Sequence, residues 1–292
     1  MTAAGEVDGT ADPALLRTLA RRSAGQMSAE NFPVALRVLP AEIRADLAAV
    51  YRFARFVDDV GDEAPTDTDG RLHLLDLLEQ DVLLLGAGTP TLPPVVDLAA
   101  VTTRRAVPLT TYLDLVEANR VDQRRTSYET FDDLLGYCRL SAAPVGRIVL
   151  HVAGAANREN IADSDAVCAA LQVLEHCQDV GEDARRGRVY LPAAELRSHG
   201  VADTALRAAG TSPALRAVLA EQVTRARGLL EQGRPLVSRL SGWARLAVTG
   251  YVAGGLATAD ALERADHEVL ARPVTPSKAR TARAAAWLWV RR

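Results

Sequence analysis

The stretch SDAVCAALQVLEHCQDVGEDAR, residues 164–185, decides the fold class of this chain. Its apolar residues recur every three or four positions, which is the period of an amphipathic α-helix. Ser164 stands where it can cap the first turn of that helix. The stretch therefore predicts one long helix that ends in an acidic segment.

The same period continues through most of the chain, and no alternation of apolar and polar residues marks a strand. We expect further helices over residues 13–25, 40–63, 67–85, 93–106, 109–122, 129–157, 212–239 and 241–270. No linker rich in proline or serine separates two cores, so the predicted fold is all-α, a single-domain helical bundle. Its predicted parts are a flexible N-terminus (1–12), the helical domain (13–271) and a C-terminal tail (272–292).

Composition excludes several classes of protein. An apolar content of 48% with 24% charged residues rules out intrinsic disorder, and a net charge of −3 argues against a nucleic-acid partner. No apolar run is long enough for a transmembrane helix, and the first residues lack the pattern of a signal peptide. The three cysteines form no CxxC motif, which suits reduced thiols. We therefore expect a cytoplasmic protein.

The segment YRFARFVDDVGDE, residues 51–63, carries the first cluster of charged residues. On a helix, Asp58 and Asp62 are one turn apart and project from the same face. Tyr51 and Arg55 lie on the same stripe, before the acidic pair. A single pair of this kind is equally well explained as a solvated acidic face.

The second cluster repeats the pattern, because Asp179 and Asp183 are again one turn apart and Glu175 lies one turn earlier. Like charges at this spacing cost a helix roughly 0.2–0.5 kcal/mol per pair. Mg²⁺ binds carboxylate oxygens together with substrate phosphates, and arginines bind the remaining phosphate oxygens. Two acidic stripes, each beside an arginine, therefore favour a magnesium and diphosphate site over two solvated faces balanced by arginines.

The segment YCRLSAAPVGR, residues 137–147, predicts a kinked helix, because Pro144 removes a backbone hydrogen bond. The residues beside the kink are small, namely Ser141, Ala142, Ala143 and Gly146. They make room either for a long hydrocarbon chain or for close packing of another helix. Tyr137, one turn before Ser141, has an aromatic ring that can stabilise a positive charge.

Together these motifs resemble the squalene/phytoene synthase family. The matching text is FARFVDDVGDE (53–63), YCRLSAAPVGR (137–147) and CQDVGEDARRGRVYLP (177–192), supported by ENFPVA (30–35) and ANRVDQ (118–123). ENFPVA and CQDVGED are most similar to the hydroxysqualene synthase subgroup of bacterial hopanoid pathways. The resemblance implies the all-α isoprenoid (terpenoid) synthase fold, with a central apolar cavity.

The resemblance also implies roles for particular residues. The metal ligands would be Asp58, Asp62, Asp179 and Asp183, with Glu175 standing where many relatives have asparagine. The diphosphate ligands would be Tyr51, Arg55, Arg188, Tyr251 and Arg272. Tyr137 and the four aspartates would be catalytic, and Arg188 and Tyr190 would form a flap over the metals. The implied cofactor is Mg²⁺, as a cluster of two or three ions. NADPH is not expected, because Gly86 and Gly88 end a helix and no strand precedes them.

The implied reaction ionises presqualene diphosphate, and water then captures the rearranged carbocation to give hydroxysqualene and diphosphate. Tyr137, Glu175 and His176 are candidates for positioning that water. An alternative reaction condenses two farnesyl or geranylgeranyl diphosphates to presqualene diphosphate, squalene or phytoene. A second alternative is a catalytically silent binding or assembly factor, although such proteins lose metal-binding acids and this chain keeps both pairs.

The C-terminal tail, residues 272–292, combines basic and aromatic residues. It has six basic residues and no acidic residue, and Trp287 and Trp289 lie near its end. A segment of this composition can lie on an anionic membrane surface, or it can be a last helix with a solvated basic end. The expected partners are a prenyl diphosphate, a membrane surface and other enzymes of the hopanoid pathway, and no nucleic acid.

Overall fold

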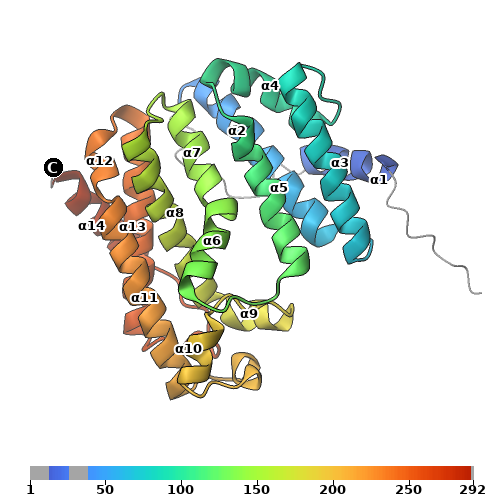
Figure 1. Ribbon diagram of the computed structural model, residues 1–292. Helices are drawn as coiled ribbons and strands as arrows, with labels where there is room; N and C mark the ends of the chain where they lie inside the picture. The colour runs from blue at the N-terminus through green and yellow to red at the C-terminus, as the bar shows by residue number, and fades with distance from the viewer. Residues whose placement is uncertain (1–12, 26–38, 291–292) are drawn as a thin grey trace, which may run out of the picture. The chain divides into compact units, whose positions relative to one another are not determined.

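The computed structural model describes residues 13–25 and 39–290, and its regular elements in these ranges are all helices (Figure 1). The predicted all-α fold class is confirmed. Contacts between the helices group them into two compact units, residues 1–124 and 125–292, and each unit is described by itself. The N-terminal residues 1–12 and the ENFPVA motif at 30–35 lie outside the described residues.

The first unit consists of five α-helices and one π-helical turn in its described part. They are α1 (Pro13–Gly25), α2 (Ala41–Asp58), the π turn (Asp59–Glu63), α3 (Thr68–Ala87), α4 (Pro93–Arg105) and α5 (Leu109–Arg124). Helix α3 packs on α5, and α2 packs on α4 and α5. The buried ring of Phe53 on α2 meets the ring of Tyr112 on α5 edge to face, with centroids 5.5 Å apart. These contacts fix the end of α2, which carries the first acidic pair.

The second unit contains the longest helices. Its elements are α6 (Phe131–Ser141), α7 (Ala143–Val152), α8 (Arg158–Gln178), α9 (Val180–Arg185), α10 (Ala193–Ser198), a 3₁₀ turn (Asp203–Arg207), α11 (Pro213–Gly233), α12 (Pro235–Arg239), α13 (Gly242–Arg264) and α14 (Lys278–Val290). Helix α8 packs against α7, α11 and α13. Leu150, Leu174 and Leu230 from three of these helices are buried in the core. Helix α8 is thus surrounded by other helices, and its last turns carry the second acidic pair.

Several predicted helices differ from the observed ones, and the single helix predicted over 164–185 is divided at Asp179 into α8 and α9. The single helix predicted over 129–157 is two helices, because Pro144 lies in the first turn of α7 and the chain breaks at Ala142. The cap predicted at Ser164 is wrong, because Asn157 caps α8 and accepts a hydrogen bond from the Asn160 amide at 2.9 Å, while Ser164 is buried inside the helix. The helix predicted over 212–239 is divided at Pro235 into α11 and α12.

The tail contains a helix, α14, which packs against α13 and buries Leu288. The division predicted between residues 271 and 272 stays a prediction. Among residues 13–25 and 39–290, no helix is both long and apolar enough to cross a membrane.

Candidate functional site

The first acidic pair lies where α2 changes from an α-helix to a π-helical turn. Asp58 is the last residue of α2, and Asp62 lies in the π turn (Asp59–Glu63). A π turn is rare and is often found at functional sites, because it re-aims side chains that a regular helix would stack. The spacing of the pair in sequence is therefore that of one α-turn, but the backbone that carries it is wider.

Two amides of α5 hold this turn. Asn119 Nδ2 donates to Asp58 Oδ1 at 3.2 Å, and Gln123 Nε2 donates to the Gly61 carbonyl at 2.9 Å. A Cβ at Gly61 would lie 2.2 Å from Asn119 Oδ1, so only glycine allows this approach. Both amides belong to the ANRVDQ motif, which the sequence identified only as a supporting match. Neither Asn119 nor Gln123 was predicted as a site residue.

If Asp58 binds a metal ion as the sequence predicts, replacing Gly61 with alanine is expected to lower turnover about 10- to 100-fold, the range found when a group that orients a metal ligand is lost. The added methyl group would displace the Asn119 amide from Asp58. Steady-state kinetics of Gly61→Ala, Asn119→Ala and the double variant test this. The double variant should be no slower than Asn119→Ala alone, because both changes remove the same hydrogen bond. Additive losses would contradict the explanation.

Arg55, a predicted diphosphate ligand, is paired with its neighbours in this structure. Its Nε lies 2.9 Å from Asp59 Oδ1, and its Nη2 lies 3.1 Å from Glu63 Oε1. The half-buried Tyr51 lies on the same helix, one turn before Arg55. Both side chains thus belong to the helix end that carries the first pair, as predicted, and the guanidinium is already oriented by two carboxylates.

The Asp58 carboxyl is crowded although the residue keeps an exposed edge. Burial, together with the neighbouring carboxylates of Asp62 and Asp59, raises the pKa of Asp58 to about 6, against the opposing effects of Asn119 and Arg55. An acid whose pKa is higher in the folded than in the unfolded state destabilises the fold as pH rises through that interval. The ionised carboxylate thus lacks enough positive charge around it.

Asp58→Asn is therefore expected to raise the melting temperature at pH 8 without metal, by about 2 °C, a modest value because the group is partly hydrated. At pH 4 the two proteins should melt together, since the carboxyl is then protonated in the folded state. Thermal unfolding at both pH values measures the difference. An equal shift at pH 4 and pH 8 would show that charge is not the cause.

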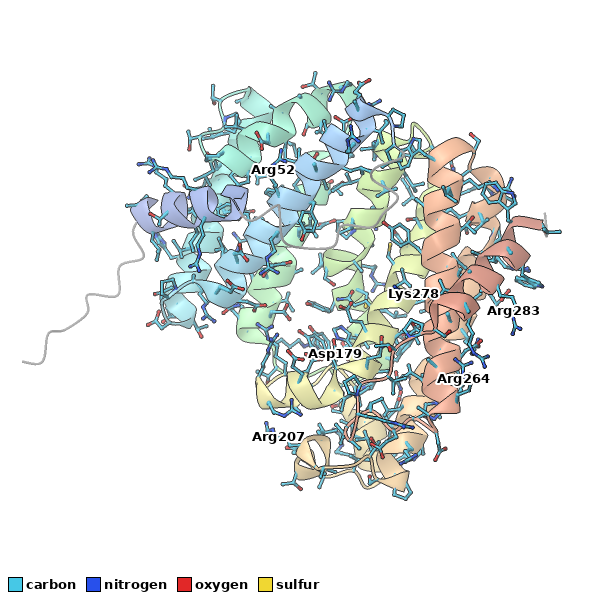
Figure 2. All side chains as sticks on the ribbon, turned by 180° about the vertical axis from the view of Figure 1, so that it is seen from behind. Arg52, Asp179, Arg207, Arg264, Lys278 and Arg283 are labelled. Carbon is cyan, nitrogen blue, oxygen red and sulfur yellow. The ribbon has the colours of Figure 1, made fainter. Side chains whose placement is uncertain are left out.

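The second acidic pair lies at the junction of α8 and α9 (Figure 2). The Asp179 amide donates to the Glu175 carbonyl, and the Asp183 amide donates to the Asp179 carbonyl, both at 2.9 Å. The i to i+4 spacing thus continues across the junction, and the three acids follow one another turn by turn. Both residues keep exposed surface, but the partial burial of their carboxyl groups and the neighbouring carboxylates raise the pKa values of Glu175 and Asp179. The predicted acidic stripe is present within this unit.

A cluster of aromatic rings lies beside this stripe. The His176 ring stacks on Tyr190 with centroids 3.8 Å apart, and Tyr128 and Tyr137 pack against Tyr190 at 5.8 and 5.6 Å. His176 Nδ1 lies 3.8 Å from Asp183 Oδ2, and its buried Nε2 has no hydrogen-bond partner in the part of the chain that the structure describes. Tyr137, predicted to be catalytic, therefore belongs to this aromatic cluster.

The segment predicted as a flap is anchored. The Val189 amide donates to the Thr126 carbonyl and the Ala193 amide to the Tyr128 carbonyl, both at 2.8 Å. Tyr190 is buried in the aromatic cluster, while Arg188 is half-buried and its amide donates to the Asp183 carbonyl at 2.9 Å. In this structure these hydrogen bonds fix the loop, and the loop places Arg188 beside the second acidic pair.

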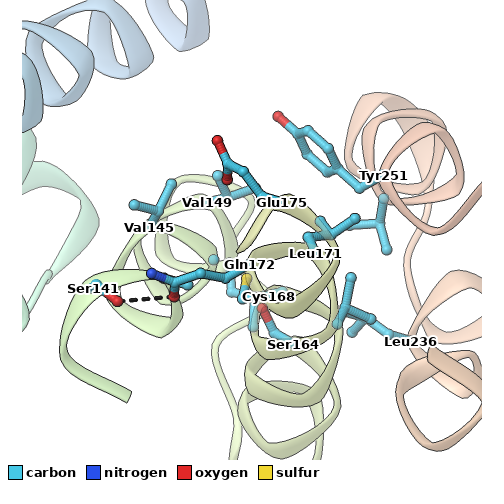
Figure 3. Close-up of a pocket in the computed structure, with 15 residues that line it drawn as sticks. Ser141, Val145, Val149, Ser164, Cys168, Leu171, Gln172, Glu175, Leu236 and Tyr251 are labelled. Carbon is cyan, nitrogen blue, oxygen red and sulfur yellow. Dashed lines mark hydrogen bonds between the residues drawn. The ribbon is translucent and has the colours of Figure 1, made fainter. Parts of the chain in front are cut away.

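An apolar pocket of about 310 Å³ lies within the second unit (Figure 3). Helices α6 and α7 form one side of it and α8 another, and Leu236, Val248 and Tyr251 complete the lining. The Glu175 carboxylate and the Tyr251 hydroxyl point the same way at one end of the pocket (Figure 3). The small residues near Pro144 therefore do border a cavity, and Gly146 also packs closely against α8. Close packing of another helix is thus observed at Gly146, and the binding of a hydrocarbon chain in the pocket stays a prediction.

A second pocket, of about 330 Å³, brings Arg272 and Asp179 to the same cavity. Arg185 also lines it, and Gln178 Nε2 donates to the Val274 carbonyl and so holds the loop that carries Arg272. We call it the Arg272 pocket. A predicted diphosphate ligand and a predicted metal ligand, distant in sequence, thus share one cavity.

The structure groups the predicted residues as follows. The first unit holds Asp58, Asp62, Tyr51 and Arg55, and the second unit holds Asp179, Asp183, Glu175, Tyr137, Arg188, Tyr251 and Arg272. Across the described residues, no three side chains of histidine, cysteine, aspartate or glutamate form a ready metal-binding group. The assignment of ligands therefore stays a prediction.

The family model and the most similar relatives point to the same protein family. Residues 26–280 match the squalene/phytoene synthase family. The hydroxysqualene synthase of Rhodopseudomonas palustris is 41% identical over 72% of this chain and 71% of its own length, and that of Sinorhizobium fredii is 40% identical over 75% and 74%.

The solved structures that resemble this chain belong to enzymes of the same kind. The squalene synthase HpnC from Alicyclobacillus acidocaldarius superposes with a TM-score of 0.78 and 36% identity, over 88% of this chain and 97% of that chain. A dehydrosqualene synthase, at 21% identity and a TM-score of 0.78 over 94% of this chain and 95% of that chain, shares the fold. The chain has the isoprenoid synthase fold, and it belongs to the squalene/phytoene synthase family of enzymes.

Proposed function

We propose that this protein is a magnesium-dependent enzyme that converts presqualene diphosphate to hydroxysqualene and releases diphosphate. The observation that carries this proposal is the identity of 41% and 40% to two hydroxysqualene synthases, each over more than 70% of the chain. The phytoene synthase of Mycobacterium tuberculosis is 33% identical over 60% of the chain.

The carboxylates fit a hard divalent cation. The pKa values of Asp58, Glu175 and Asp179 are raised by burial and by neighbouring carboxylates. A bound cation would therefore stabilise the ionised form of these carboxyl groups. We assign Mg²⁺ to the pair Asp58 and Asp62 and to the pair Asp179 and Asp183, with Glu175 as an additional ligand. When bound, Mg²⁺ supplies positive charge that neutralises the departing diphosphate.

The chain's own residues then have three tasks. Arg55, Arg188 and Arg272 bind diphosphate oxygens, Tyr51 and Tyr251 border the diphosphate, and Tyr137 stabilises positive charge through its ring. The apolar pocket holds the hydrocarbon and keeps bulk water from the carbocation.

Product analysis tests the proposed reaction directly. Purified protein is incubated with Mg²⁺ and, in separate reactions, with presqualene diphosphate and farnesyl diphosphate, without a reductant. A hydroxylated C30 alcohol from presqualene diphosphate alone is the expected result. Products from farnesyl diphosphate would instead favour the condensation reaction, and omission of Mg²⁺ should abolish turnover in either case.

We also propose that α14 mediates peripheral contact with a membrane surface. Lys278 and Arg283, labelled in Figure 2, are exposed on this helix, and so are Trp287, Trp289 and Val290. Exposed basic and aromatic side chains together suit an anionic lipid surface. Sedimentation with vesicles of anionic lipid, and the loss of binding when Lys278 and Arg283 are replaced by glutamate, test this contact. Contact with other hopanoid-pathway enzymes stays a prediction from the sequence.

A further inference from the structure

The wall of the apolar pocket contains a polar group that the sequence did not single out. Gln172 lies on α8, one turn before Glu175, and both side chains line the pocket. Gln172 is half-buried, whereas Glu175 is exposed. Around Gln172 the lining is mainly apolar, with Val145, Val149 and Leu171 nearby in Figure 3.

The Gln172 amide is held in one orientation. Ser141 Oγ donates to Gln172 Oε1 at 2.8 Å, and the Tyr137 carbonyl lies farther from the same hydroxyl, at 3.1 Å. Ser141 is the last residue of α6, so the bond joins the helix end at the break to α8. An amide fixed at its oxygen has lost most of its rotamer freedom before any ligand binds.

The nitrogen of the Gln172 amide is available to bind a ligand. The Gln172 side chain lines the pocket, and its nitrogen makes no hydrogen bond within residues 13–25 and 39–290. Leaving the N–H group of a half-buried amide unsatisfied in apolar surroundings costs free energy. A bound molecule that accepts a hydrogen bond from this group removes that cost. Water is the smallest molecule that satisfies it.

The three residues that the sequence offered for this task are placed differently. Tyr137 and His176 belong to the aromatic cluster, and neither lines the apolar pocket. Glu175 lies at the end of the pocket where the Tyr251 hydroxyl also points (Figure 3). Gln172 is therefore the polar side chain placed among the apolar lining residues and already fixed by another side chain.

We propose that the amide of Gln172, held by Ser141, positions the water molecule that captures the carbocation. This inference rests on the proposed function. The water accepts a hydrogen bond from Gln172 Nε2, and its other lone pair forms the new C–O bond to the cationic carbon. The proton lost from the resulting oxonium passes to the departing diphosphate, the base that the reaction itself supplies. A neutral amide suits this task, because a carboxylate would itself bind the cation.

The test uses Gln172→Met, which keeps the length of the side chain and removes its polar end. The full-length protein is assayed with presqualene diphosphate and Mg²⁺ in H₂¹⁸O, and diphosphate release and the mass of each product are measured together. The ratio of hydroxylated to non-hydroxylated C30 product is expected to fall about tenfold, the effect of one lost hydrogen bond. The rate of diphosphate release should stay within about twofold, because ionisation precedes the capture of water.

Two further variants make the result decisive. Ser141→Ala keeps the amide but frees it, so the hydroxylated fraction should fall by less than in Gln172→Met. Gln232→Met removes an exposed amide on α11 and should leave the ratio unchanged. An unchanged ratio in Gln172→Met, or an equal loss of diphosphate release and hydroxylation, would overturn the inference. If the unaltered protein forms no ¹⁸O-labelled alcohol, it is the proposed function that fails.

Discussion

Replacing Asp179 with asparagine is expected to lower the rate of diphosphate release about 10³-fold, at an almost unchanged melting temperature. Asparagine has nearly the same shape but cannot supply the negative charge that Mg²⁺ requires. Asp179 lies at the exposed junction of α8 and α9, so the substitution disturbs little packing. Pre-steady-state release of diphosphate from presqualene diphosphate, with a thermal scan of the same sample, measures both quantities.

The matched control for this prediction is Glu159→Gln, which removes a negative charge from the exposed first turn of the same helix. Its rate should equal that of the unaltered protein. A similar loss in both variants would show that general electrostatics, rather than metal binding, is responsible.

The double variant Asp58→Asn with Asp179→Asn tests the sequence prediction that both acidic pairs serve one diphosphate. Residues that act as a unit give strongly non-additive losses. The double variant should therefore be at most about tenfold slower than the Asp179 variant alone. Losses that multiply would mean that the two pairs act independently.

The largest effect on stability is expected at Gly233, the last residue of α11, which packs closely against α8. A Cβ there would lie 2.5 Å from the Asp163 carbonyl oxygen and 2.5 Å from Val167 Cγ2. The first of these atoms is backbone, so the clash cannot be relieved by rotating a side chain. Gly233→Ala is expected to lower the free energy of unfolding by about 3 kcal/mol, near the upper end for overpacked cores, and the melting temperature by about 6–10 °C.

Gly228→Ala on the same helix is the control for this prediction. No atom lies within 4 Å of a Cβ at that position, so alanine should be neutral or slightly stabilising because it favours the helix. Thermal unfolding of both variants distinguishes the clash from a general effect of alanine. Equal destabilisation by the two substitutions would contradict close packing as the cause.

Features that depend on residues near one another in sequence were predictable. The period of apolar residues predicted the long helices, and spacing alone predicted two acidic pairs, Asp58 with Asp62 and Asp179 with Asp183. The helix breaks were less accurate. Pro144 predicted a kink where the chain breaks at Ala142, and Pro235 was not expected to divide a helix. A proline opens a new helix as readily as it bends one, so neighbouring packing decides the outcome.

Contacts between distant segments were not predictable from the sequence. The short helix α10 and the loop that pairs Val189 with Thr126 lack a strong apolar period, and tertiary hydrogen bonds hold that loop. The role of Asn119 could not be predicted from the sequence. An asparagine inside a helix has many possible partners, and only the packing of α5 against α2 places it beside Asp58. The aromatic cluster likewise draws His176 and Tyr190 from separate segments.

The sequence by itself determined that the chain is helical, which family it resembles and which acids are spaced four residues apart, since helix period and motif spacing are local properties. Only the tertiary structure decided which side chains face a cavity. The Ser141 hydroxyl, 31 positions away in sequence, fixes the Gln172 amide, and Asn119 on α5 reaches Asp58 on α2. Such pairings depend on how helices pack, and packing brings together residues whose distance along the chain carries no information about their distance in space.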